Sequence, residues 1–174
     1  MDREFGSRDG CDVVKKAEDL IAEFNKKCKE DVGGEEDFAA IAQTEDGQTA
    51  IVIVDPLMRQ VHKNVPQSGE ICLIDATSNL DRNDTKFFHL VCPSPIGALP
   101  LGEIICTRED AQTIQFGLEL LQTVLPLEAF YGRGKFKGPM VFMTDDSDVE
   151  RLALRRVWSE AELLICIFHI LQAQ

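Results

Sequence analysis

Residues 138–171, GPMVFMTDDSDVERLALRRVWSEAELLICIFHIL, decide the fold predicted for this chain. The apolar run at residues 140–144 predicts a strand that ends in the acidic sequence DDSD. Ser147 and Glu150 have the spacing of a capping box, so a helix is expected to begin there. Its expected apolar face consists of Val149, Leu152, Ala153 and Val157. A second apolar run at residues 163–168 predicts another strand. This order is typical of an α/β domain with a site at its strand ends.

Composition predicts a folded protein with one ordinary domain and a helical extension. The chain has 174 residues, of which 44% are hydrophobic and 28% are charged. Its net charge of −12 argues against a surface built to bind polyanions and is compatible with divalent cations or basic partners. The six cysteines form no regular framework, and no secretory signal or membrane-spanning run is recognised. We therefore expect a nuclear or cytoplasmic protein that is neither secreted nor in a membrane.

Three segments are expected along the chain. Residues 1–34 form a tail and an amphipathic helix, which a polar, glycine-containing break follows. Residues 35–69 form a hairpin, indicated by Asp46-Gly47 between two apolar runs, and then a short helix and a turn. Residues 70–174 form the core domain.

The expected core is an α/β domain with a mixed five-stranded sheet and flanking helices. The apolar run at residues 71–74 predicts a buried strand, and residues 86–92 and 99–106 predict two more. Their close spacing favours antiparallel neighbours. A helix after Asp110 and a basic, flexible loop at residues 131–135 then lead to the opening stretch. Three meandering strands, helix, strand, helix and strand are the layout of the ribonuclease H-like fold.

Two aspartates are the candidate chemical residues. Asp75 and Asp145 each follow an apolar strand, and in this layout the two strands lie side by side. Carboxylates of this kind suit Mg²⁺ or Mn²⁺, which could support phosphodiester transfer. Acidic residues after strands are equally common as turn formers and helix caps. Asp146, Asp148 and Glu150 are interpreted in this second way, as residues of the turn and the helix start.

The remaining candidates are weaker by pattern alone. Cys166 and His169 have C-x-x-H spacing, but a zinc site needs four ligands, so a buried cysteine and a hydrogen-bonded histidine are the simpler interpretation. His62 and His89 have no companions at catalytic spacing and are interpreted as structural or surface residues. A dehalogenase-type phosphatase would need a second aspartate where Thr77 stands. The opening meander also argues against a receiver domain.

The core sequence resembles the transposase domain of Mutator-like elements, the MULE transposases. The resemblance rests on IDATSNLDR, SPIGALPLGEIICTRE, GPMVFMTDDSDVERLAL and LLICIFHILQA, in this order. It implies a DDE-type, ribonuclease H-like core that uses Mg²⁺ or Mn²⁺. Asp75 matches the family's first catalytic aspartate and Asp145 its second, with Asp146 as the alternative. Cys166 and His169 match the family's C-x-x-H motif, for which zinc is the weaker option.

One family residue has no counterpart in this sequence. The family's third acid is a glutamate on a helix well after C-x-x-H, and this sequence ends at Gln174. We therefore expect a transposon-derived, partial DDE transposase core that is inactive alone. DNA is the partner of the full-length family, and weak DNA binding and homo-oligomers are considered for this chain. The alternative is a non-catalytic, domesticated remnant that acts as a protein interaction module.

Overall fold

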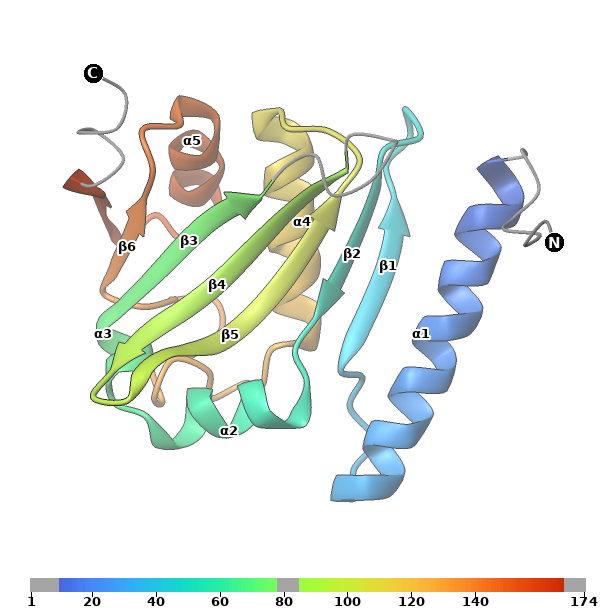
Figure 1. Ribbon diagram of the computed structural model, residues 1–174, viewed down its shortest axis with the longest axis horizontal. Coiled ribbons are helices and arrows are strands. Elements are labelled where there is room, and N and C mark those ends of the chain that lie inside the picture. The colour runs from blue at the N-terminus through green and yellow to red at the C-terminus, as the bar shows by residue number, and fades with distance from the viewer. Residues whose placement is uncertain (1–9, 78–84, 168–174) are drawn as a thin grey trace, which may run out of the picture.

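The computed structural model describes residues 10–77 and 85–167, which form an α/β structure around one mixed sheet (Figure 1). The sheet has seven strands in the order β1-β2-β5-β4-β3-β6-β7. The strands are β1 (Ala39–Gln43), β2 (Thr49–Ile53), β3 (Ile71–Thr77), β4 (Lys86–Ser94), β5 (Gly97–Cys106), β6 (Val141–Thr144) and β7 (Glu162–Ile165). The helices are α1 (Gly10–Val32), α2 (Pro56–Asn64), α3 (Gln67–Glu70), α4 (Ala111–Val124) and α5 (Asp148–Val157).

The core strands follow the predicted order and directions. β3, β4 and β5 form an antiparallel meander, as their short connections require. β6 pairs parallel with β3, and β7 pairs parallel with β6. Helices α4 and α5 lie in the connections that lead to β6 and β7. The predicted mixed sheet with an antiparallel opening meander is therefore confirmed.

The prediction of five strands is wrong, because the hairpin belongs to the same sheet. β2 pairs antiparallel with β5, from Ala50 opposite Cys106 to Ile53 opposite Glu103. Ala50 and Val52 are fully buried in the common core. Without the hairpin, β5 would be an edge strand with unpaired backbone groups. The division at residue 70 remains a prediction about folding units, and the sheet continues across it.

Helix α1 runs beside the edge strand β1 (Figure 1). The buried Asn25 side chain joins the two elements through three hydrogen bonds. Its Oδ1 accepts from the backbone N–H groups of Phe38 and Ala39 at 2.8 and 2.9 Å, and its Nδ2 donates to the Ala39 carbonyl at 2.9 Å. Within residues 10–77 and 85–167, no helix is both long enough and apolar enough to cross a bilayer.

The main core lies between the sheet and helices α4 and α5, which Figure 1 shows behind the strands. Alternate residues of each strand face this core, as the two-residue period of a strand requires. On β3 they are Cys72 and Ile74, and on β6 they are Phe142 and Thr144. The opposite face of the sheet therefore carries the residues between them, including Asp75.

Candidate metal centre

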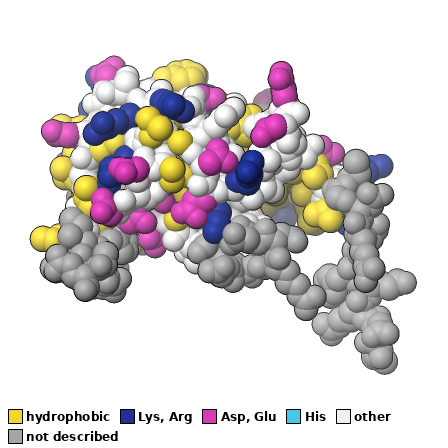
Figure 2. All heavy atoms as spheres, turned by 90° about the horizontal axis from the view of Figure 1, so that it is seen from above, with side chains coloured by type: hydrophobic (Ala, Val, Ile, Leu, Met, Phe, Trp, Pro, Cys, Tyr) yellow, Lys and Arg dark blue, Asp and Glu magenta, His cyan; other side chains and the backbone are white. Residues whose placement is uncertain are grey.

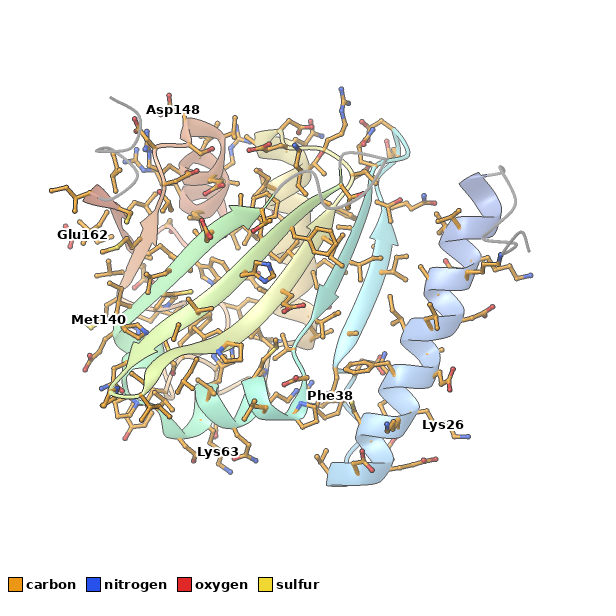
Figure 3. The ribbon with its side chains drawn as sticks, in the orientation of Figure 1. Lys26, Phe38, Lys63, Met140, Asp148 and Glu162 are labelled. Atoms are coloured by element: carbon orange, nitrogen blue, oxygen red, sulfur yellow. The ribbon has the colours of Figure 1, made fainter. Side chains whose placement is uncertain are left out.

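Asp75 lies two residues before the end of β3, and Asp145 directly follows β6, the parallel neighbour of β3. The register of β3 and β6 pairs Leu73 with Met143; Asp75 comes two residues after Leu73, within β3, and Asp145 two residues after Met143, just past the end of β6. The predicted adjacency of the two strands is thereby confirmed. Figure 3 shows the two ends of β6, with Met140 near its start and Asp148 beyond its other end. Asp75 is exposed and Asp145 is half-buried.

The turn after β6 holds the Asp145 side chain in place. Asp145 Oδ1 accepts a hydrogen bond from the Ser147 backbone N–H at 2.8 Å. The Thr144 hydroxyl donates to the Asp145 carbonyl at 2.7 Å. Ser147 is the N-cap of α5, and its hydroxyl accepts from the Glu150 backbone N–H. One carboxylate of the pair is thus oriented by the start of the following helix.

Asp146 and Asp148 are both engaged by Arg151. Arg151 Nη1 donates to Asp146 at 3.0 Å, and its Nη2 donates to Asp148. Asp146 and Asp148 are exposed, and Asp148 lies in the first turn of α5, where negative charge is favourable. These contacts agree with the interpretation of Asp146 and Asp148 as residues of the turn and the helix start. Asp145 is therefore a better metal-ligand candidate than its alternative, Asp146.

The interpretation of Glu150 as part of a capping box is wrong. Its side chain does not return to the Ser147 N–H, which donates to Asp145 instead. Glu150 is fully buried, at 0% exposure. The predicted apolar face is also rotated, because Leu152 is 44% exposed whereas Glu150, Ala153 and Leu154 are buried. Glu150 thus lies in the stripe that faces the core.

Glu150 has an unusual electrostatic environment. Neither of its carboxylate oxygens accepts a hydrogen bond from a donor in the described part of the chain. Burial raises the pKa of Glu150 to about 8, helped by the nearby charges of Asp145, Glu109 and Asp75. A side-chain interaction with Asp145 raises the pKa further. Three acidic side chains, Asp145, Glu109 and Asp75, therefore lie within electrostatic reach of Glu150.

His89 has acidic neighbours that sequence spacing did not reveal. It lies opposite Asp75 in the β3–β4 register and opposite Glu103 in the β4–β5 register. His89 Nδ1 is 3.6 Å from Glu103 Oε1. The interpretation of His89 as a structural or surface residue stays a prediction, and its acidic neighbours come from the adjacent strands. The signal was present in the predicted meander, but only the exact strand register identifies which residues face each other.

Basic residues border the acidic edge. Lys86 pairs with Glu109 at 3.3 Å, and both line a pocket with Thr107, Arg108 and Asp110. Figure 2 views the molecule from above this edge and shows Asp and Glu side chains gathered among Lys and Arg side chains. The edge thus combines carboxylates that suit a cation with basic side chains that suit a phosphate.

The donor set fits a hard divalent cation in chemistry. Mg²⁺ and Mn²⁺ prefer carboxylate and water oxygens, and Glu150 supplies buried oxygens that lack a hydrogen-bond donor. In residues 10–77 and 85–167, no three His, Cys, Asp or Glu side chains already form a group able to hold a metal. A cation would therefore be held first by Asp75 and Asp145, and further ligands would have to move toward it.

The C-x-x-H motif is described only in part. The Cys166 backbone N–H donates to the Thr144 carbonyl at 2.7 Å, which places this residue beside the end of β6. Its side chain is half-buried. His169 lies outside the described residues, so the pair and its weak zinc assignment remain untested.

His62 is a structural residue, as predicted. Its Nε2 donates to the Leu101 carbonyl at 3.0 Å, and its Nδ1 accepts from the Phe130 N–H at 3.2 Å. Burial lowers the pKa of His62 to about 4, so the ring is neutral. Both ring nitrogens are satisfied, which leaves no position for a ligand.

Comparisons with known proteins give no family assignment. No protein-family model matches this chain, and no curated protein matches it.

Proposed function

We propose that this chain derives from the core of a MULE-type DDE transposase with a ribonuclease H-like fold. In this proposal, Asp75 and Asp145 bind a divalent cation that serves DNA strand cleavage and transfer in the full-length family. The observation that supports the proposal is the parallel pairing of β3 with β6, in which Asp75 and Asp145 each come two residues after the paired Leu73 and Met143. The strand order β5-β4-β3-β6-β7 also supports it.

The chain's own residues would hold and orient the reacting groups. A bound Mg²⁺ or Mn²⁺ supplies Lewis acidity for activating water and stabilising a leaving oxygen. Asp145, fixed by the Ser147 N–H, offers a ligand in a defined orientation. Asp75 is exposed, so a nucleic-acid backbone could reach it. Lys86 and Arg108 line the neighbouring pocket, where they could contact phosphates.

Cation binding can be tested with matched aspartate variants. Mn²⁺ affinity is measured by the loss of the free-ion paramagnetic resonance signal for the wild type, Asp75→Asn, Asp145→Asn and Asp146→Asn. We expect the first two variants to lose about ten-fold or more in affinity. Asp146→Asn should retain binding, because Asp146 is exposed and paired with Arg151. No Mn²⁺ binding by the wild type at millimolar concentrations would refute the proposed cation site.

Catalysis is tested separately from binding. The prediction from the sequence is that the chain does not cut DNA alone, and incubation with supercoiled plasmid and Mn²⁺ checks it. Nicking that Asp145→Asn abolishes would show an active enzyme and contradict that prediction. Cation binding without nicking would favour the alternative, a non-catalytic remnant that acts as a protein interaction module.

A further inference from the structure

Glu150 is the buried acidic group that the proposed aspartate pair leaves unexplained. It is fully buried, and both of its oxygens lack a hydrogen-bond donor in the part of the chain that the structure describes. A buried carboxylate is costly unless it is protonated, paired with a positive group or bound to a metal. Its neighbours in the same stripe of α5 are Ala153 and Leu154, so packing alone does not call for an acid here.

Glu150 lies within electrostatic reach of the candidate metal centre. The charges of Asp145, Glu109 and Asp75 all act on its buried carboxyl. The Ser147 cap fixes the first turn of α5 directly after Asp145. The same turn therefore orients the Asp145 carboxylate and fixes the Glu150 backbone in the first turn of α5.

We propose that Glu150 is the buried carboxylate ligand of a divalent-cation site that it forms with Asp145 and Asp75. The inference rests on the proposed function, because it extends the cation site proposed there. It differs from the family resemblance, in which the third acid lies on a helix after C-x-x-H. Glu150 precedes Cys166 and lies in the first turns of the helix that follows β6.

Cation binding requires a local rearrangement. No three ligand side chains of the described residues already form a group that could hold a metal. Asp75 is exposed, so its side chain can reorient toward Asp145. Glu150 is buried in the first turn of α5, which begins just after Asp145, so a cation held by Asp145 could also reach its oxygens after a small shift. A positive ion would then stabilise acidic side chains that otherwise repel one another.

The test compares two acidic residues of the same edge. Mn²⁺ affinity is measured by paramagnetic resonance for the wild type, Glu150→Gln and Glu109→Gln. Glutamine keeps the size of the side chain and removes its charge. We expect Glu150→Gln to weaken binding about ten-fold or more. Glu109→Gln should lose little, because Glu109 is held by Lys86 in an ion pair.

Two outcomes separate this inference from the proposed function. If Asp145→Asn weakens Mn²⁺ binding and Glu150→Gln does not, Glu150 is not a ligand, while the aspartate site stands. If the wild type binds no Mn²⁺, both proposals fail. Circular dichroism without metal confirms that each variant is folded. Retained folding is expected for Glu150→Gln, because a neutral amide of nearly the same size and shape replaces the buried carboxyl group.

A second readout locates the bound ion. Bound Mn²⁺ broadens the NMR signals of nearby nuclei, so the amide signals of Ser147 and Glu150 should disappear first in the wild type. Broadening that centres instead on exposed acids of α1, such as Glu18 and Glu30, would overturn the assignment.

Discussion

At the scale of single residues, Glu150 should make the stability of the metal-free protein depend on pH. Its pKa is about 8 in the folded chain and 4.5 ordinarily. Between these values the folded state holds a proton that the unfolded state has lost, so stability falls as pH rises. The expected slope is roughly 1.4 kcal/mol per pH unit. Glu150→Gln should remove this fall. Urea unfolding in the presence of a chelator, at several pH values between 5 and 8, measures how the free energy of unfolding depends on pH.

Asp148→Asn is the matched control for this prediction. Asp148 lies in the first turn of the same helix but is exposed and paired with Arg151. Its replacement should shift stability slightly at all these pH values and keep the slope. A wild-type chain whose free energy of unfolding is flat from pH 5 to 8 would contradict the assignment of a buried, protonated Glu150.

At the scale of elements, the connection before β6 is held in place rather than flexible as predicted. Phe130 is buried, and the Lys135 carbonyl accepts hydrogen bonds from Trp158 Nε1 at 2.8 Å and Gln122 Nε2 at 3.3 Å. Trp158 also stacks on Phe142, with ring centroids 5.1 Å apart. The basic and glycine residues of this connection suggested flexibility. The buried Trp158 side chain, whose partner is remote in sequence, was not predictable from local composition.

Gly138 should be one of the least replaceable residues of this connection. Its φ is +73°, and an added Cβ would lie 2.6 Å from Trp158 Cδ1. Gly138→Ala combines a left-handed backbone with a clash against a buried ring. We expect a loss of about 2–4 kcal/mol in the free energy of unfolding.

Gly132→Ala separates these two effects. Gly132 has a φ of +80° and no atoms within 4 Å of an added Cβ, so only the backbone strain applies. Its expected loss is about 1–2 kcal/mol. Equal losses in the two variants, measured by urea unfolding, would argue against tight packing between Gly138 and Trp158.

At the scale of the whole molecule, the sequence predicted the core topology because its signals are local. Apolar runs, short connections and the helix start after Asp110 are enough to order β3 to β7 and to predict that β3 and β6 are neighbours. The pairing of β2 with β5 and the burial of Glu150 depend on contacts between distant segments. Glu150 was assigned to a cap because Ser147 precedes it at the right spacing, and this pattern does not report which face of α5 meets the core.

The pairing of β2 with β5 predicts that residues 70–174 will not fold well alone. A fragment of residues 70–174 lacks the hairpin, so the long edge of β5 and the α4 surface that packs on Ala50 would be exposed. It would also lack His62, which holds the Leu101 carbonyl and the Phe130 N–H. We expect this fragment to aggregate or to show poor NMR dispersion and no cooperative thermal transition.

A chain of residues 35–174 is the control, because it lacks α1 and retains all seven strands. The loss of α1 removes the Asn25 contacts with β1, so this shorter chain should be less stable than the full chain. It should still unfold cooperatively, because the strand pairs and the core between the sheet and α4 remain. If residues 70–174 unfold as cooperatively as residues 35–174, the hairpin is an attachment to an independent core. If only the longer chain does so, the seven-stranded sheet is the folding unit that positions Asp75, Asp145 and Glu150.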